Sequence, residues 1–204
     1  MSRAGSRARL RSRIAIPAIA ACSAALALGA APASALTLPP IDPGSVLPGL
    51  PLGGGKSGGC PGAKRVPAGM THRRARAVIL CAINRARKAR GLPALRPIRT
   101  LRVAAGRHAY DMARHHYFAH VSLGGSGVLS RLHRAGWSGC AYGEALAWGC
   151  GRRASPRATV RSWLDSPVHR AILLSPLYRL AGIGIADRAP DGCRGGTWVL
   201  DAGR

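Results

Sequence analysis

The sequence predicts an α+β domain in which helices precede a small sheet. Residues 71–90 and 100–116 carry apolar side chains at three- and four-residue steps, which is the period of an amphipathic helix. Residues 182–186 and 197–201 are short apolar stretches that look like two strands, joined by a loop with proline and glycine. Because helices and strands occur in blocks, with two short helices interposed, the pattern indicates a layered α+β domain.

The two long helices have recognisable ends. Gly91 and Pro93 stop the first helix, since neither residue continues a helical turn well. Thr100 is the expected N-cap of the second helix. Within that helix His108 lies on the same apolar face as Met112, so we interpret His108 as a core histidine and not as a ligand.

Shorter elements follow the glycine-rich loop at residues 124–127. We expect a short helix at 128–135 and a strand at 142–148. Ser-Pro pairs at 155–156 and 166–167 start two further helices, because serine is a good N-cap and proline suits the first helical turn.

The first 35 residues have the organisation of a signal peptide. Five arginines without any acidic residue precede an apolar run from Ile14 to about Ala31. The small-residue triplet at 33–35, Ala-Ser-Ala, follows this run. This order of charge, apolar segment and small residues is typical of export signals, and we predict cleavage after Ala35.

Two other interpretations of this segment are weaker. A permanent membrane anchor would need about 20 apolar residues, and Pro17 and Pro32 interrupt the run. A lipoprotein box around Cys22 lies too early, because most of the apolar residues follow it. We therefore expect a secreted protein that does not span a membrane after cleavage.

Composition separates a linker from the domain and sets its charge. Residues 36–59 are dominated by proline and glycine, which predicts a linker before a domain at residues 60–204. Loss of residues 1–35 removes five of 31 basic side chains, and the remaining 26 face 7 acidic ones. Such a charge attracts anionic lipids and cell-envelope polymers. Nucleic acid is disfavoured as a partner, because the basic residues are scattered and aromatic residues are few.

Five cysteines remain after the predicted cleavage: Cys60, Cys81, Cys140, Cys150 and Cys193. In an exported protein, cysteines are disulfide partners first and metal ligands second. We expect Cys60 to pair with Cys81. Cys140 and Cys150 would join the ends of the segment between them, and a pairing of either with Cys193 is also open. The odd number leaves one thiol free or bound to another molecule.

Three polar residues stand out in a chain with so few acids. Glu144 is the only glutamate, and it lies in an apolar stretch where a carboxylate needs a partner. His120 and His169 add two imidazoles. Zinc and copper use imidazole and carboxylate ligands, and acid–base catalysis uses the same groups. Glu144 is therefore the best candidate for a catalytic residue, although the sequence assigns no reaction.

Several short motifs occur in a fixed order between residues 80 and 203. They are LCAIN at 80–84, GLPAL at 91–95, AAGRHAYDM at 104–112, YFAH at 117–120, RLHRAG at 131–136, GEALA at 143–147, WLDSPVHR at 163–170, LLSP at 173–176, GIG at 182–184 and TWVLDAG at 197–203. In order and spacing, they resemble the bacterial secreted branch of the CAP superfamily, also called the SCP domain. That superfamily includes cysteine-rich secretory proteins, antigen 5 and plant pathogenesis-related proteins.

The resemblance implies a three-layer α-β-α sandwich with a small central antiparallel sheet and a cleft. It implies that His120, Glu144 and His169 point into this cleft and can hold a divalent metal, with zinc as the candidate cofactor. The second acidic position of many relatives falls at or next to Ser166, and Asp165 is the nearest carboxylate.

Two usual asparagines of the family are replaced here by Ala145 and Ile172. Both changes remove a side chain that would help to orient the site. We therefore expect a three-residue constellation and not a complete set of four.

Four functions follow as hypotheses. The first is a secreted CAP module that binds an extracellular ligand without committed turnover. The second is a zinc-dependent hydrolase of an ester, peptide or glycan, with metal at His120 and His169 and Glu144 as third ligand or general base. The third is a cationic protein of the cell envelope that acts through charge. The fourth, suggested by some relatives, is a carrier of lipid or sterol.

Overall fold

The computed structural model describes residues 59–204. The helices are α1 His72–Lys88, α2 Arg99–Arg114, α3 Val128–Arg134, α4 Pro156–Asp165 and α5 Pro167–Leu173, with 3-10 turns at Pro67–Gly69 and Gly151–Ala154. The strands are β1 Arg96–Pro97, β2 Tyr142–Cys150, β3 Leu180–Arg188 and β4 Arg194–Gly203. The predicted signal peptide at 1–35, the lipoprotein box at Cys22 and all but the last residue of the linker lie outside the described residues.

The strands form one sheet in the order β1-β3-β4-β2. β4 pairs antiparallel with both β3 and β2, whereas β1 pairs parallel with β3 at Leu180 and Ala181. The α+β class and the layers are confirmed, but the sheet is mixed and not wholly antiparallel. The difference comes from β1, two residues long, which precedes α2 and was not predicted from the sequence.

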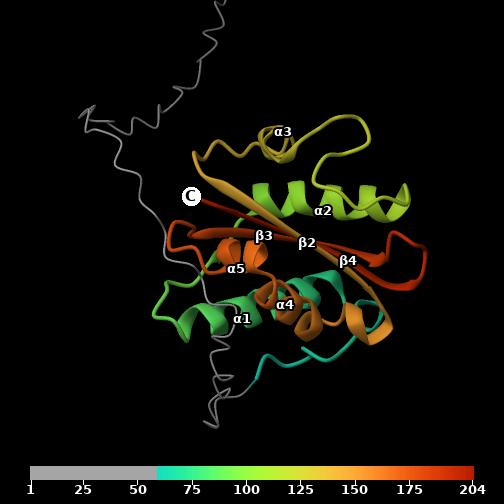
Figure 1. Ribbon diagram of the computed structural model, residues 1–204, viewed down its shortest axis with the longest axis horizontal. Helices are drawn as coiled ribbons and strands as arrows, with labels where there is room; N and C mark the ends of the chain where they lie inside the picture. The colour runs from blue at the N-terminus through green and yellow to red at the C-terminus, as the bar shows by residue number, and fades with distance from the viewer. Residues whose placement is uncertain (1–58) are drawn as a thin grey trace, which may run out of the picture. The chain divides into compact units, whose positions relative to one another are not determined.

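Helices cover both faces of the sheet. Figure 1 shows α2 and α3 on one side of the strands and α1, α4 and α5 on the other. Side chains along β4 point alternately to the two faces of the sheet. Trp198 and Leu200 join the core under α1 and α4, while Val199 packs with Met112 of α2. As expected, His108 lies in this second layer, with 1% of its surface exposed. No helix in residues 59–204 has both the length and the apolar character that crossing a bilayer requires.

Bare glycines allow α2 to lie directly on β3. A Cβ atom built on Gly184 would lie 2.1 Å from the carbonyl oxygen of Ala105, and one on Gly182 would lie 2.1 Å from the backbone nitrogen of Arg102. Real Cβ atoms do not approach backbone this closely. The helix–sheet distance in this layer therefore depends on the absence of side chains at these two positions.

A buried arginine holds the end of α1 to the segment after α5. Arg87 is 0% exposed, and its guanidinium donates to four backbone carbonyl oxygens. These oxygens belong to Pro93, Leu173, Ser175 and Tyr178, at distances of 2.7–3.1 Å. Burial is the main cause that lowers the pKa of Arg87, and the nearby charge of Arg179 adds to it. The carbonyl cage is what makes this charge tolerable inside the domain.

Helix starts agree with the sequence in part. Ser155 caps α4 by accepting from the Ala158 N–H, as predicted. The expected cap of α2 at Thr100 is wrong, because Ile98 occupies the N-cap position without a side-chain hydrogen bond. The Ile98 N–H donates to the Ala181 carbonyl of β3, so pairing with the sheet sets where this helix begins.

The disulfides are Cys60–Cys81, as predicted, and Cys150–Cys193. The expected Cys140–Cys150 bond is wrong, and the alternative left open, a pairing of Cys150 with Cys193, is the bond present. Cys140 lies two residues before β2 and Cys150 is its last residue. An extended strand of this length, rising about 3.3 Å per residue, keeps the two residues beyond the reach of a disulfide. Cys193 lies instead in the β3–β4 turn, next to the end of β2, where the Cα atoms of Cys150 and Cys193 are 5.8 Å apart.

Gly184→Ala is expected to destabilise the domain by roughly 3 kcal/mol or more, because the added methyl group meets helix backbone that cannot move aside. Gly106→Ala on α2 is the matched control, since its Cβ meets nothing within 4 Å. That change should stabilise by about 0.5–1 kcal/mol through helix propensity. Chemical unfolding in guanidinium chloride measures both, and equal effects would contradict the close-contact explanation.

Arg87→Leu should lower the free energy of unfolding by roughly 3 kcal/mol or more, because it leaves four carbonyl oxygens without their donor. Arg73→Leu, on the exposed face of the same helix, should change it by about 0.5 kcal/mol or less. Urea titration followed by circular dichroism compares the two variants. A similar small effect of both would show that the carbonyl cage contributes little.

Candidate functional site

The carboxylate of Glu144 is the centre of a buried polar cluster. Glu144 lies on β2 with only 2% of its side chain exposed. Its Oε1 accepts from Nδ1 of His120 at 2.7 Å, and its Oε2 accepts from Nη2 of Arg131 at 2.6 Å. Both oxygens of the carboxylate are therefore engaged by charged or polar donors, as a buried acid requires.

Arg131 connects this carboxylate to the loop that carries His120. The residue lies on α3, and its side chain is 7% exposed. Its Nη1 donates to the backbone oxygens of His120 and Ser126, both at 2.8 Å. One guanidinium thus fixes the acid, the backbone of the imidazole residue and the loop between α2 and α3.

A second buried acid lies beside Glu144. Asp201 on β4 is the cross-strand partner of Glu144, so the two side chains share one face of the sheet. Burial and, after it, the neighbouring charge of Glu144 raise the pKa of Asp201 well above its ordinary value. Arg131 acts in the opposite direction. Asp201 therefore favours its protonated form, and its Oδ1 has no hydrogen-bond partner in residues 59–204.

His169 approaches this cluster from the other helical layer. It lies on α5, which packs on the opposite face of the sheet, and β2 is an edge strand. Desolvation lowers the pKa of His169, and the nearby imidazole of His120 lowers it further. The two histidines are thus close enough to repel when charged, and His169 is neutral at pH 7. The side chain of His120 is 53% exposed, so this edge of the sheet is accessible from solvent.

The contact with Glu144 decides how His120 can act. An ionised carboxylate only accepts hydrogen bonds, so the proton of a neutral His120 ring is on Nδ1, facing Glu144. Nε2 then carries the lone pair. Carboxylates orient metal-binding histidines in this way, with the carboxylate on one ring nitrogen and the metal on the other. In this geometry Glu144 orients the His120 ring, whose Nδ1 atom faces the carboxylate.

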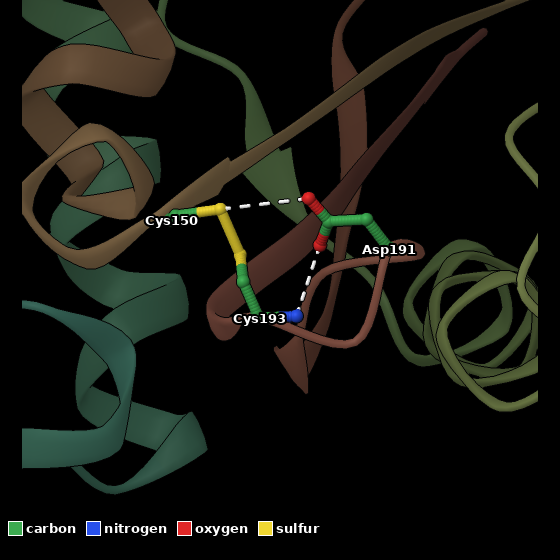
Figure 2. Close-up of side chains that lie close together, drawn as sticks. All are labelled: Cys150, Asp191 and Cys193. Atoms are coloured by element: carbon green, nitrogen blue, oxygen red, sulfur yellow. Dashed lines mark hydrogen bonds between the residues drawn. A yellow bond between two sulfur atoms is a disulfide. The ribbon is translucent and has the colours of Figure 1, made fainter.

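In residues 59–204, only one group of three or more His, Cys, Asp or Glu side chains brings its ligand atoms within 4.8 Å of one another. Figure 2 shows this group, which is Cys150, Asp191 and Cys193. A disulfide joins the two sulfur atoms, so no thiolate is available to a metal. Asp191 closes the β3–β4 turn by accepting from the Cys193 N–H at 2.9 Å.

Residues 80–201 match the CAP family, the cysteine-rich secretory protein family. The chain belongs to the CAP family. The matched region runs from α1 to β4, and it includes His120, Glu144 and His169. No curated protein sequence matches the chain.

Several solved structures have a similar fold. An extracellular protein containing a SCP domain from Bacillus anthracis is 23% identical, with a TM-score of 0.57 over 66% of this chain and 44% of the other. An outer surface protein from Borrelia burgdorferi is 24% identical, with a TM-score of 0.53 over 62% of this chain and 90% of the other. A cysteine-rich secretory protein from Staphylococcus aureus is 16% identical, with a TM-score of 0.51 over 65% of this chain and 39% of the other. The aligned part is thus less than half of the first and third relatives.

The CAP domain brings together some of the residues predicted from sequence. His120 and Glu144 are in direct contact, and His169 lies near His120. Asp165, the candidate for the second acid, points away, with its side chain 71% exposed and its Oδ2 3.6 Å from Nε of Arg161 one helical turn earlier. Ser166 lies at the junction of α4 and α5, where its backbone N–H bonds to the Ser162 carbonyl.

Two members of the cluster, Arg131 and Asp201, were not predicted. Both lie in motifs that carry the family resemblance, RLHRAG and TWVLDAG, but the motifs assign them no role. Arg131 could have been suspected because a buried glutamate needs a cation. Asp201 could have been suspected because it is an acid inside an otherwise apolar strand, although the pairing with Glu144 depends on strand register.

The pKa of His169 should lie below 6.5 when followed by NMR of the ring protons. His120→Gln should raise it toward 6.5, because that change removes the repulsion between two imidazolium ions. His72→Gln is the control, since His72 contacts Asp187 instead. An unchanged His169 titration in the His120 variant would mean that the two rings do not interact.

Proposed function

We propose that this protein is an extracellular CAP module that binds a ligand through a two-histidine site at the outer edge of β2. His120 and His169 are the contact groups, and Glu144 orients His120. The observation that carries the proposal is the short contact between His120 and a buried glutamate whose second oxygen is held by Arg131. Metal-binding histidines are commonly oriented in this way, by a carboxylate on the second ring nitrogen.

A divalent cation of the zinc class suits these donors. Metal binding needs neutral imidazole, and the lowered pKa of His169 favours that form at pH 7. With two protein ligands, coordination would be completed by water or by a carboxylate or phosphate of the ligand. A bound metal would supply Lewis-acid attraction for such an anionic group.

Binding is favoured over turnover by the state of Glu144. A general base for hydrolysis must have a free lone pair within reach of a water molecule. Glu144 has one oxygen on His120 and the other on Arg131, and it is almost fully buried. We therefore place a ligand-binding function before the hydrolase hypothesis.

Export agrees with the chemistry of the domain. Two disulfides within residues 59–204 are suited to an oxidising compartment. The relatives from Bacillus anthracis and Borrelia burgdorferi are described as an extracellular and an outer surface protein. Together with the signal-peptide pattern at residues 1–35, these facts support secretion.

Calorimetric titration with zinc tests the site. The protein should bind one zinc ion, with affinity that falls as pH decreases because protons compete for the imidazoles. His120→Ala plus His169→Ala should abolish binding. Glu144→Gln should weaken it by about 10- to 100-fold, as loss of an orienting carboxylate does.

Asp165→Asn is the matched control, because the Asp165 side chain is exposed and its carboxylate pairs with Arg161. It should bind zinc like the parent protein. Equal zinc binding by the parent protein and the double histidine variant, with both folded by circular dichroism, would refute the proposal.

A further inference from the structure

The loop between α2 and α3, residues 115–127, exposes three apolar side chains to solvent. Leu123 is 69% exposed, Val121 53% and Phe118 43%. The Phe118 ring contacts Trp148 of β2, which is also exposed, with the two ring centroids 6.5 Å apart. Single exposed apolar residues are ordinary, but several in one short segment indicate a surface that binds a partner. We call Phe118, Val121, Leu123 and Trp148 the apolar patch.

Hydrogen bonds fix the backbone of this loop. The Gly125 N–H donates to the Ser122 carbonyl at 2.8 Å, which closes a turn with Leu123 as its first central residue. The Ser122 N–H donates in turn to the Ser126 carbonyl at 3.0 Å, and Arg131 of α3 donates to the same carbonyl at 2.8 Å. The loop is therefore ordered before it meets a partner, so docking through it costs little conformational entropy.

Positive charge lies beside the apolar patch. Arg107 of α2 and Arg134 of α3 are exposed, and neither forms an ion pair with an acid of residues 59–204. Both border the same hollow as Ser122 and Ser126, the two serines of the loop. Of the residues that line this hollow, only Asp111 is acidic, and its carboxylate already contacts the ring of a neighbouring histidine. The loop thus combines exposed apolar side chains with positive charge that is not neutralised locally.

The outer face of α2 extends this positive charge. Arg99, Arg102, Arg107 and Arg114 are all exposed, whereas the opposite face of the helix, which includes Ala109, is buried in the core. Figure 1 shows the loop on the same side of the sheet as α2 and α3. An extended anionic surface would therefore meet the arginines and the loop together.

An anionic lipid bilayer is the partner that fits both features. A soluble polyanion, such as a nucleic acid or a charged polymer of the cell envelope, attracts the arginines but leaves Val121 and Leu123 in water. A bilayer offers phosphate headgroups to the arginines and an acyl boundary to the apolar side chains. Trp148 suits the level between them, because indole has an apolar ring and a polar N–H group.

We propose that this protein docks on the surface of an anionic bilayer through the loop between α2 and α3. Val121 and Leu123 enter the outer acyl region, and Arg107 and Arg134 contact lipid phosphates. This is docking on a membrane surface and not the carriage of a lipid molecule. It does not depend on the two-histidine site proposed above, because none of these four side chains is a ligand there.

Sedimentation with lipid vesicles tests the docking. The protein is used without its signal peptide, which mass spectrometry checks, because a retained apolar leader would itself bind lipid. The protein should bind vesicles of phosphatidylglycerol and phosphatidylcholine, and this binding should weaken as salt rises. It should bind pure phosphatidylcholine at least tenfold more weakly. Failure to bind the phosphatidylglycerol vesicles, or equal binding to both kinds of vesicle, would overturn the proposal.

Val121→Ser plus Leu123→Ser should weaken vesicle binding about tenfold or more, because two inserted apolar side chains are lost. Val168→Ser plus Leu177→Ser is the matched control. It removes the same two side chain types from exposed positions at and after α5, in the other helical layer, and should change binding less than about twofold. Equal losses in the two variants, both folded by circular dichroism, would show that the loop is not the docking surface.

Dextran sulfate is the probe for a soluble polyanion. The Val121 and Leu123 double variant should bind it like the parent protein, because dextran sulfate has no acyl phase. An equal loss of binding to dextran sulfate and to vesicles would overturn the assignment of these two side chains to the bilayer.

Arg107→Gln plus Arg134→Gln should weaken vesicle binding about tenfold or more, because each basic group near an anionic surface contributes to attraction. Arg73→Gln plus Arg90→Gln removes the same charge from exposed positions on α1 and just after it, in the other helical layer. This control should change binding less than about threefold. Equal losses would reduce the effect to net charge and overturn the docking surface.

The fluorescence of Trp148 reports which face meets the lipid, because the other three tryptophans of the chain are buried. Phosphatidylglycerol vesicles with brominated acyl chains should quench this fluorescence. Trp148→Phe should remove the quenching while vesicle binding is retained. Quenching that persists in full in this variant would place another face of the domain on the membrane and overturn the proposal.

Discussion

The buried carboxylate of Glu144 is the constraint around which this CAP domain arranges its polar interior. A charge with 2% side-chain exposure is tolerable only with a close counter-ion and saturated hydrogen bonds. Arg131 supplies the charge, and in doing so it also binds the backbone oxygens of His120 and Ser126. The arginine that neutralises Glu144 thus also holds in place the loop that carries the exposed imidazole of His120.

The position of β2 at the edge of the sheet converts this cluster into a surface feature. A residue on a central strand would be covered by helices on both faces. On an edge strand, the loop after α2 and the start of α5 can approach from opposite layers, which places His120 near His169. The side chain of His120 is therefore accessible to solvent, although the Glu144 carboxylate that it contacts is buried.

The same economy of acidic groups explains the positive surface. The four acids other than Glu144 and Asp201 in residues 59–204 all have local partners: Asp111 with His115, Asp165 with Arg161, Asp187 with His72 and Asp191 with the Cys193 N–H. Few acids are left to neutralise the exposed arginines. Attraction of anions is consequently a property of the whole domain.

Local sequence signals determined much of this protein: the helix periods, the Ser155 cap, the strand near Glu144 and the choice of three polar residues that motifs of the family mark. Tertiary structure decided the rest. Strand register places Glu144 opposite Asp201. Because β2 is extended, Cys150 lies next to Cys193 and far from Cys140, and it forms its disulfide with Cys193. The parallel pairing of β1 with β3 determines where α2 begins. The physical reason is one of range. Propensity and periodicity act over a few neighbouring residues, whereas counter-ions, cross-strand neighbours and sulfur partners are selected by distances that exist only after the chain has folded.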